Sequence, residues 1–177
     1  MIEGALGWWA EHRDTGSISA FARRIDSWTS ASPNPGQRAL LRYAAASAPA
    51  YLAVARHDTA DALRRFALVP DSLCFGCYLG RLTRIRLLAL KGQNAEAARL
   101  LDERAHTRAE LLPSEISWAL ERARVNEGLG RWDKAIQNYA FVVRVWAQAD
   151  STLQPVVAEA RAALKRLGGE PRLAARN

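Results

Sequence analysis

The stretch LGRWDKAIQNYAFVVRVW, from Leu129 to Trp146, decides the fold. A helix that begins at Trp132 would carry one stripe at steps of four, three and four residues, made of Ala135, Tyr139, Val142 and Trp146. Gly130 stands just before it, and glycine readily ends a preceding helix because it adopts the left-handed conformation without strain. The stretch therefore predicts the tight corner of a helical hairpin.

The same arrangement recurs earlier in the chain in weaker form. The copies are Gly92 with Ala97 and Leu101, His57 with Ala62 and Phe66, and, faintest, Ala20 or Ala22 before Ile25 and Trp28. Each copy follows a longer stretch rich in alanine, leucine and arginine. A helix–turn–helix unit that recurs every ~30–45 residues is typical of an α-solenoid.

The residues Gly130, Trp132, Ala135, Ile136 and Tyr139 resemble the tetratricopeptide repeats. In that family a small residue on the second helix lets the two helices approach closely. A large aromatic residue four positions later fills the seam between neighbouring hairpins. The resemblance implies a short right-handed α-solenoid of about four antiparallel hairpins, closed by a C-terminal capping helix.

Taken whole, the chain is also similar to the repeat-bearing C-terminal region of certain bacterial serine/threonine protein kinases, through Trp118–Gly130 and Val143–Leu164. The expected organisation is a single domain over residues 1–167, followed by a flexible tail at 168–177. Its expected units are hairpins at 1–30, 36–70, 71–112 and 113–150 and a capping helix at 152–167.

Composition indicates an all-α protein. Of the 177 residues, 49% are hydrophobic and 24% charged, which is ordinary for a folded chain, and no alternating strand pattern occurs. The net charge of +7 invites a nucleic-acid interpretation. However, the basic residues are nearly all arginines and are spread along every helix, so nucleic-acid binding remains only a third hypothesis.

The sequence has neither an apolar run long enough to span a membrane nor a signal-peptide pattern. As written, the chain is expected to be cytoplasmic. Its first residues, MIEGALGWWAEHRD, open in a helical pattern without a cap, which favours a piece of a longer chain. If that longer protein is anchored in a membrane, the location remains open.

Helix boundaries can be predicted from caps and prolines. Ser17, Asn94 and Ser114 are expected N-caps, and Ser151 or Thr152 is expected to start the last helix. The stretch TSASPNPG, residues 29–36, is expected to be a loop. Pro49 falls inside a helical pattern, where it removes a backbone donor, so a kink or break is expected near residue 48.

Cys74 and Cys77 form the sharpest local motif, a C-x-x-C at an expected helix start, capped by Asp71 or Ser72. Such a position lowers a thiol pKa and permits a disulfide, but the strand that precedes the motif in redox enzymes is missing. A buried pair of small side chains and a reversible disulfide both remain open. No second pair of metal ligands, catalytic triad or phosphate loop accompanies it, so neither an enzyme nor a metal or other cofactor is expected.

The resemblance to tetratricopeptide repeats implies that the first helix of each hairpin lines a concave groove for peptides. Counting back from the small residue of each second helix places Tyr51, Arg86, Arg124 and Glu127 towards that groove. Arg86 and Arg124 could together clamp a carboxylate, because the planar guanidinium binds it bidentately. Ordinary solvated arginines are the alternative.

The leading functional hypothesis is therefore a non-catalytic interaction scaffold that binds an acidic protein or peptide, as a regulatory or sensor region of a signalling kinase. A thiol switch through Cys74 and Cys77 is the alternative from another class.

Overall fold

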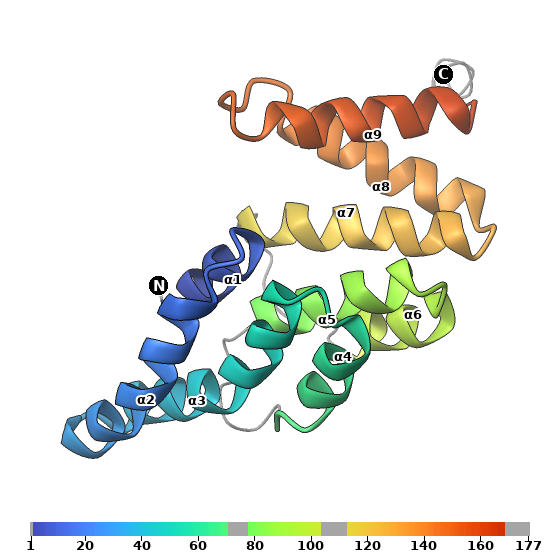
Figure 1. Cartoon of the computed structure of the whole chain (residues 1–177). Helices are drawn as coiled ribbons and strands as arrows, with labels where there is room; N and C mark the ends of the chain where they lie inside the picture. Colours follow the sequence, from blue (N-terminus) through green and yellow to red (C-terminus); the bar gives the residue numbers. More distant parts are fainter. Residues whose placement is uncertain (1, 71–77, 104–112, 169–177) are drawn as a thin grey trace. The chain divides into compact units, whose positions relative to one another are not determined.

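The computed structural model describes residues 2–70, 78–103 and 113–168, and their fold is all-α, as predicted (Figure 1). The helices are α1 (Ile2–Glu11), α2 (Thr15–Ala31), α3 (Pro35–Ala55), α4 (Thr59–Ala67), α5 (Leu79–Leu90), α6 (Asn94–Asp102), α7 (Pro113–Gly128), α8 (Trp132–Val145) and α9 (Gln154–Arg166). None of the described helices is both long and apolar enough to cross a membrane.

The residue contacts divide the chain into two compact units, Met1–Leu87 and Leu88–Asn177, where the sequence predicted a single domain. The main helix packings join helices that are neighbours or next neighbours along the chain. Because contacts of this kind are local, each of the two units can keep a hydrophobic core of its own. Each unit is therefore described by itself.

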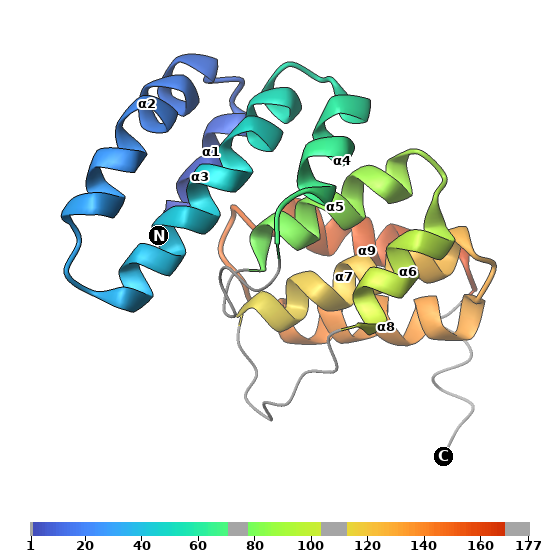
Figure 2. The ribbon, with the colours of Figure 1, turned by 90° about the horizontal axis from the view of Figure 1, so that it is seen from below.

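In the first unit, α3 packs against α1, α2 and α4, and Figure 2 shows it lying between α2 and α4. Its apolar residues form one core with those of its neighbours, among them Leu6, Ile18, Ile25, Leu41, Ala44, Tyr51, Ala62 and Phe66. The helix is apolar on more than one side, which is what a helix covered by several others requires.

In the second unit, α7 packs against α6 and α8, and α8 packs against α9. Their shared core includes Ile116, Leu120, Ala123, Ala135, Tyr139, Val142, Ala160 and Leu164. The stripe predicted for α8 is thus confirmed at Ala135, Tyr139 and Val142, while Trp146 is only partly buried at the end of that helix.

Within the described residues, the same corner joins successive helices at four places. The residues at these corners have a positive φ: Arg13 (58°), His57 (58°), Gly92 (72°) and Gly130 (68°). In each, the N–H of this residue donates to the carbonyl three residues earlier, and the next N–H donates to the carbonyl five residues before itself, at 2.8–3.2 Å. This is the Schellman pattern, which satisfies the last carbonyls of a helix. Each following helix begins two residues after the left-handed residue.

A small residue and a large one follow three of these corners at fixed positions. Ala62, Ala97 and Ala135 stand five residues after the left-handed residue, and all three are fully buried at 0% exposure. Phe66, Leu101 and Tyr139 stand four residues later and are also buried. At the first corner the fifth position is Ile18, so the alignment on Ala20 or Ala22 was wrong.

Several predicted helix starts were displaced by one to three residues. Asp14, not Ser17, caps α2: its carboxylate accepts the Ser17 N–H at 2.8 Å. Asn94 is the first residue of α6 rather than its cap, and α7 already begins at Pro113, before Ser114. Proline suits a first helical turn because the N–H it lacks has no partner there.

Of the kink or break predicted near Pro49, the break was wrong, because α3 continues through it to Ala55. Contacts with α1, α2 and α4 hold this helix along its length, and such tertiary packing offsets one missing backbone hydrogen bond. The expected loop at 29–36 is also shorter, since α2 ends at Ala31 and α3 begins at Pro35. The last helix, α9, begins at Gln154 rather than at residue 151 or 152.

Candidate functional site

Tyr51, the first of the predicted groove residues, lies in the core of the first unit. It is 1% exposed, and its ring meets the ring of Phe66 edge-on at a centroid distance of 5.2 Å. It therefore offers no surface to a partner. Counting back from Ala62 placed Tyr51 on the first helix of its hairpin, α3, as expected. However, other helices cover α3 on several sides, so Tyr51 faces the core.

Arg86 and Arg124, the two halves of the predicted clamp, belong to different compact units. Arg86 is half-buried on α5 in the first unit, and Arg124 lies on α7 in the second. The structure describes each within its own unit only, so the clamp between them stays a prediction.

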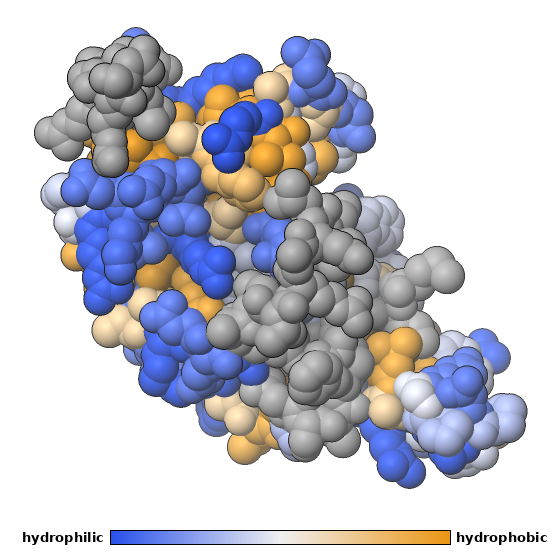
Figure 3. Space-filling model, turned by 180° about the vertical axis from the view of Figure 1, so that it is seen from behind, coloured by the Kyte–Doolittle hydropathy of each residue, from blue (hydrophilic) through white to orange (hydrophobic). Residues whose placement is uncertain are grey.

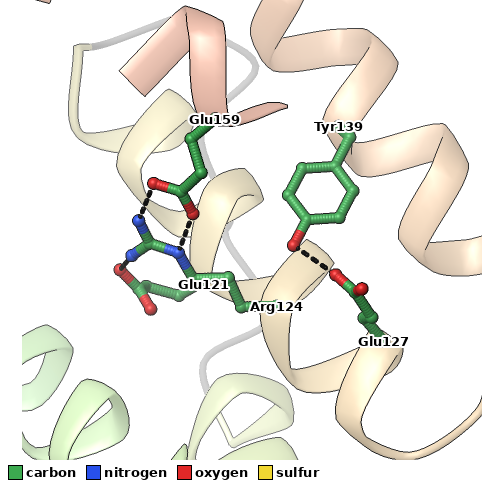
Figure 4. Close-up of polar contacts among 5 residues, drawn as sticks. All are labelled: Glu121, Arg124, Glu127, Tyr139 and Glu159. Carbon is green, nitrogen blue, oxygen red and sulfur yellow. Dashed lines mark hydrogen bonds and ion pairs between the residues drawn. The ribbon is translucent and has the colours of Figure 1, made fainter. Parts of the chain in front are cut away.

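The guanidinium of Arg124 is occupied by carboxylates of its own chain (Figure 4). Its Nε and one terminal nitrogen donate to the two oxygens of Glu159 on α9 at 2.7 and 2.6 Å. The other terminal nitrogen donates to Glu121 at 2.8 Å. Burial acts against the charged form, but these two carboxylates outweigh it and raise the pKa of Arg124, so the group stays ionised.

Glu127, the fourth predicted groove residue, is likewise engaged within the chain. Its Oε2 accepts the hydroxyl of Tyr139 at 2.8 Å (Figure 4). Its Oε1 accepts two N–H groups of Arg166 at 2.6 and 3.1 Å. Burial, together with this hydrogen bond, raises the pKa of the Tyr139 hydroxyl. The bond satisfies a phenol that the packing of α8 buries.

These two groups of contacts form what we call the α7–α9 network, made of Glu121, Arg124, Glu127, Tyr139, Glu159 and Arg166. It ties α7 to α8 and α9 by bonds between residues far apart in sequence. Glu121 is 0% exposed, and a carboxylate so buried needs a cation to offset its lost hydration. The network engages Arg124 and Glu127 in contacts within the chain, which the repeat register alone did not foresee.

A hollow of about 350 Å³ lies in the second unit between α6, α7 and α8. We call it the basic hollow. Its lining consists of Ala98, Leu101 and Asp102 from α6, Arg122, Val125 and Asn126 from α7, Arg131 at the corner, and Lys134, Gln137 and Asn138 from α8. The helices α6 and α8, together with α7 between them in the chain, thus supply most of its walls.

Three cations line this hollow, Arg122, Arg131 and Lys134, and one carboxylate, Asp102. Among the ion pairs of the described residues, none includes these three cations, whereas Arg99, Arg124 and Arg166 of the same unit each bind a carboxylate. Sequence reasoning missed the hollow because it searched only the first helices of the hairpins. The sequence did indicate a basic site here, because two cations, Arg131 and Lys134, follow the Gly130 corner in GRWDK, residues 130–134.

Other sequence features contribute less to a site. Cys74 and Cys77 lie outside the described residues, as do Asp71 and Ser72. Within the described part of the chain, no three His, Cys, Asp or Glu side chains gather in a way that could hold a metal ion. The face drawn in Figure 3 carries separate hydrophobic patches among hydrophilic residues.

No family model matches this chain, and neither does any curated protein or solved structure with which it was compared.

Proposed function

We propose that this chain is a non-catalytic scaffold that binds a protein or peptide partner on a stack of helical hairpins similar to tetratricopeptide repeats. The observation that carries the proposal is the recurring corner. Its Schellman geometry appears four times, and a fully buried alanine with a large apolar residue four positions later follows three of the corners. The resemblance assigns this pair of residues to the packing between hairpins.

A stack of hairpins suits binding better than chemistry because its helices present long rows of side chains on a rigid backbone. The similarity to the repeat-bearing region of bacterial serine/threonine kinases extends the proposal to a regulatory or sensor role beside such an enzyme. The α7–α9 network supports a rigid scaffold, since its ion pairs and the Tyr139 hydrogen bond join three helices.

Affinity capture followed by reconstitution tests this function. The full chain would be immobilised, exposed to an extract of its source organism with and without reductant, and the captured proteins would be made and titrated in pure form. We expect at least one saturable complex at physiological salt, with the partner chemically unchanged and the affinity independent of reductant.

Two results would overturn the proposal. One is that no captured protein binds once purified. The other is that a captured protein is chemically altered by the chain. A complex that forms only without reductant would instead favour the thiol switch through Cys74 and Cys77.

A further inference from the structure

We infer that the basic hollow binds an acidic segment of a partner protein, one that carries aspartate or glutamate side chains. This inference rests on the proposed scaffold function and names the site and its ligand. It places the ligand against α6 and α8, the second helices of their hairpins, rather than in the groove that the resemblance assigns to first helices.

The charge of the hollow carries the first step. Arg122, Arg131 and Lys134 converge on it from α7, the corner and α8, and no ion pair of the described residues engages them. Arginine and lysine bind carboxylates by charge-assisted hydrogen bonds, which are the stronger ones in proteins. Arg131 and Lys134 are exposed, and Arg122 is partly buried, so a ligand can reach all three without displacing a core residue.

In the second step, the uncharged residues of the lining favour a peptide over a phosphate as the ligand. The amide oxygens of Asn126, Gln137 and Asn138 can accept the N–H groups of a peptide backbone. The amide nitrogens of Asn126 and Asn138 each donate to the carbonyl four residues earlier at 2.8 Å, which leaves each a second N–H for a ligand. A phosphate dianion only accepts hydrogen bonds, so it would leave the acceptor oxygens of these amides unused. Ala98, Leu101 and Val125 add an apolar part that suits an aliphatic side-chain stem.

The size of the hollow carries the third step. A volume of about 350 Å³ is at the small end of ligand sites, which run from ~300 to 1,000 Å³, and suits a few side chains of an extended segment. A nucleic acid needs instead a basic stripe that follows many phosphates. An acidic peptide is therefore the ligand whose charge, hydrogen bonding and size all agree with the hollow.

Selection from a random peptide display library, with the full chain as bait, tests the inference. We expect the selected peptides to be enriched in aspartate and glutamate. Their binding should weaken by about 2- to 25-fold in the Arg131→Ala/Lys134→Ala double variant, since exposed ion pairs each contribute ~fivefold or less. The matched control is Arg161→Ala/Lys165→Ala, which removes the same charge from exposed positions on α9.

The outcomes separate this inference from the scaffold function. Selected peptides without acidic enrichment, or acidic peptides that bind both double variants equally, would overturn the hollow as an acidic site while leaving a peptide-binding scaffold. No selected peptide at all would count against both. The choice of ligand would be overturned if an oligonucleotide displaced the selected acidic peptide from the hollow. The same would follow if a phosphorylated peptide bound more tightly than the same peptide with glutamate at the phosphorylated position. Circular dichroism of both variants checks that each is folded.

Discussion

At the scale of single residues, Arg124 shows how an arginine that looks available in sequence can be structural. Its three guanidinium nitrogens donate to Glu121, which is 0% exposed, and to Glu159, which is 35 residues further along the chain. The pairing depends on α9 lying across α7, and local sequence carries no information about that. Arg99 makes comparable contacts with Glu96 and Glu103, but on an exposed face of its own helix.

Replacing Arg124 with methionine should therefore destabilise the protein by about 3 kcal/mol, because a buried carboxylate loses its cation. Adding Glu121→Gln should recover much of that loss, since the uncompensated charge is then gone. Urea denaturation of both variants would measure this, with Arg99→Met as the control that changes stability little. Equal losses at positions 99 and 124 would contradict the structural role of the network.

The Tyr139 hydroxyl gives the network a pH dependence. Its pKa is raised in the folded state, chiefly by burial and then by Glu127, so folding favours the protonated phenol. This stabilisation is fully present below the unfolded pKa of about 10 and is lost as pH rises through the folded pKa. Tyr139→Phe should remove that loss of stability between pH 9 and 12, as followed by melting temperature against pH at ~1-unit steps. An unchanged alkaline profile would place the phenol outside the network.

At the scale of elements, the corners explain why the helices are hairpins. Four of them share one backbone geometry, yet only two use glycine, while Arg13 and His57 adopt the same left-handed conformation at a cost. Local sequence predicted the Gly92 and Gly130 corners because glycine signals them directly. It placed His57 correctly only because the spacing to Ala62 and Phe66 was repeated.

Gly92→Ala measures the free-energy cost of the left-handed backbone conformation alone, because a Cβ at Gly92 would meet no atom within 4 Å. The substitution should cost about 1–2 kcal/mol from the positive φ alone. His57→Gly, which relieves the same strain, should leave stability unchanged or raise it. Thermal melts of the two variants would decide the matter, and a neutral Gly92→Ala would mean that this corner is not held in the left-handed conformation.

Ala135 tests the packing of α8 against its neighbours. It is 0% exposed in the core of the second unit, so Ala135→Leu should overpack that core and cost about 1–3 kcal/mol. Ala158→Leu makes the same change at an exposed position of α9 and should cost little. A melting temperature that falls equally in both variants would show that the loss does not come from the packed seam.

The sequence predicted what depends on neighbouring residues and missed what depends on tertiary placement. Helical periodicity and turn chemistry predicted α8 and its buried stripe. The continuity of α3 through Pro49 and the inner position of Tyr51 depend on the helices that cover α3. The basic hollow was missed for a similar reason, since Arg122 and Lys134 come together only when α7 and α8 pack.

At the scale of the whole molecule, an arginine-rich chain of net charge +7 divides into two compact units. Among the described residues of the second unit, three arginines bind carboxylates of the chain itself, while the three cations that line the basic hollow take part in none of the ion pairs. The basic character of the chain is thus partly neutralised inside the fold and partly gathered around the hollow at which we propose that a partner binds.

Hydrogen–deuterium exchange of the full chain, with and without the tightest acidic peptide from the display selection, tests this account most directly. The account predicts slower exchange in the C-terminal halves of α6 and α7 and in the first turns of α8, where the lining of the hollow lies. Exchange in α2 and α4 should stay unchanged. Protection confined to helices that do not line the hollow, or no protection at saturating peptide, would contradict it.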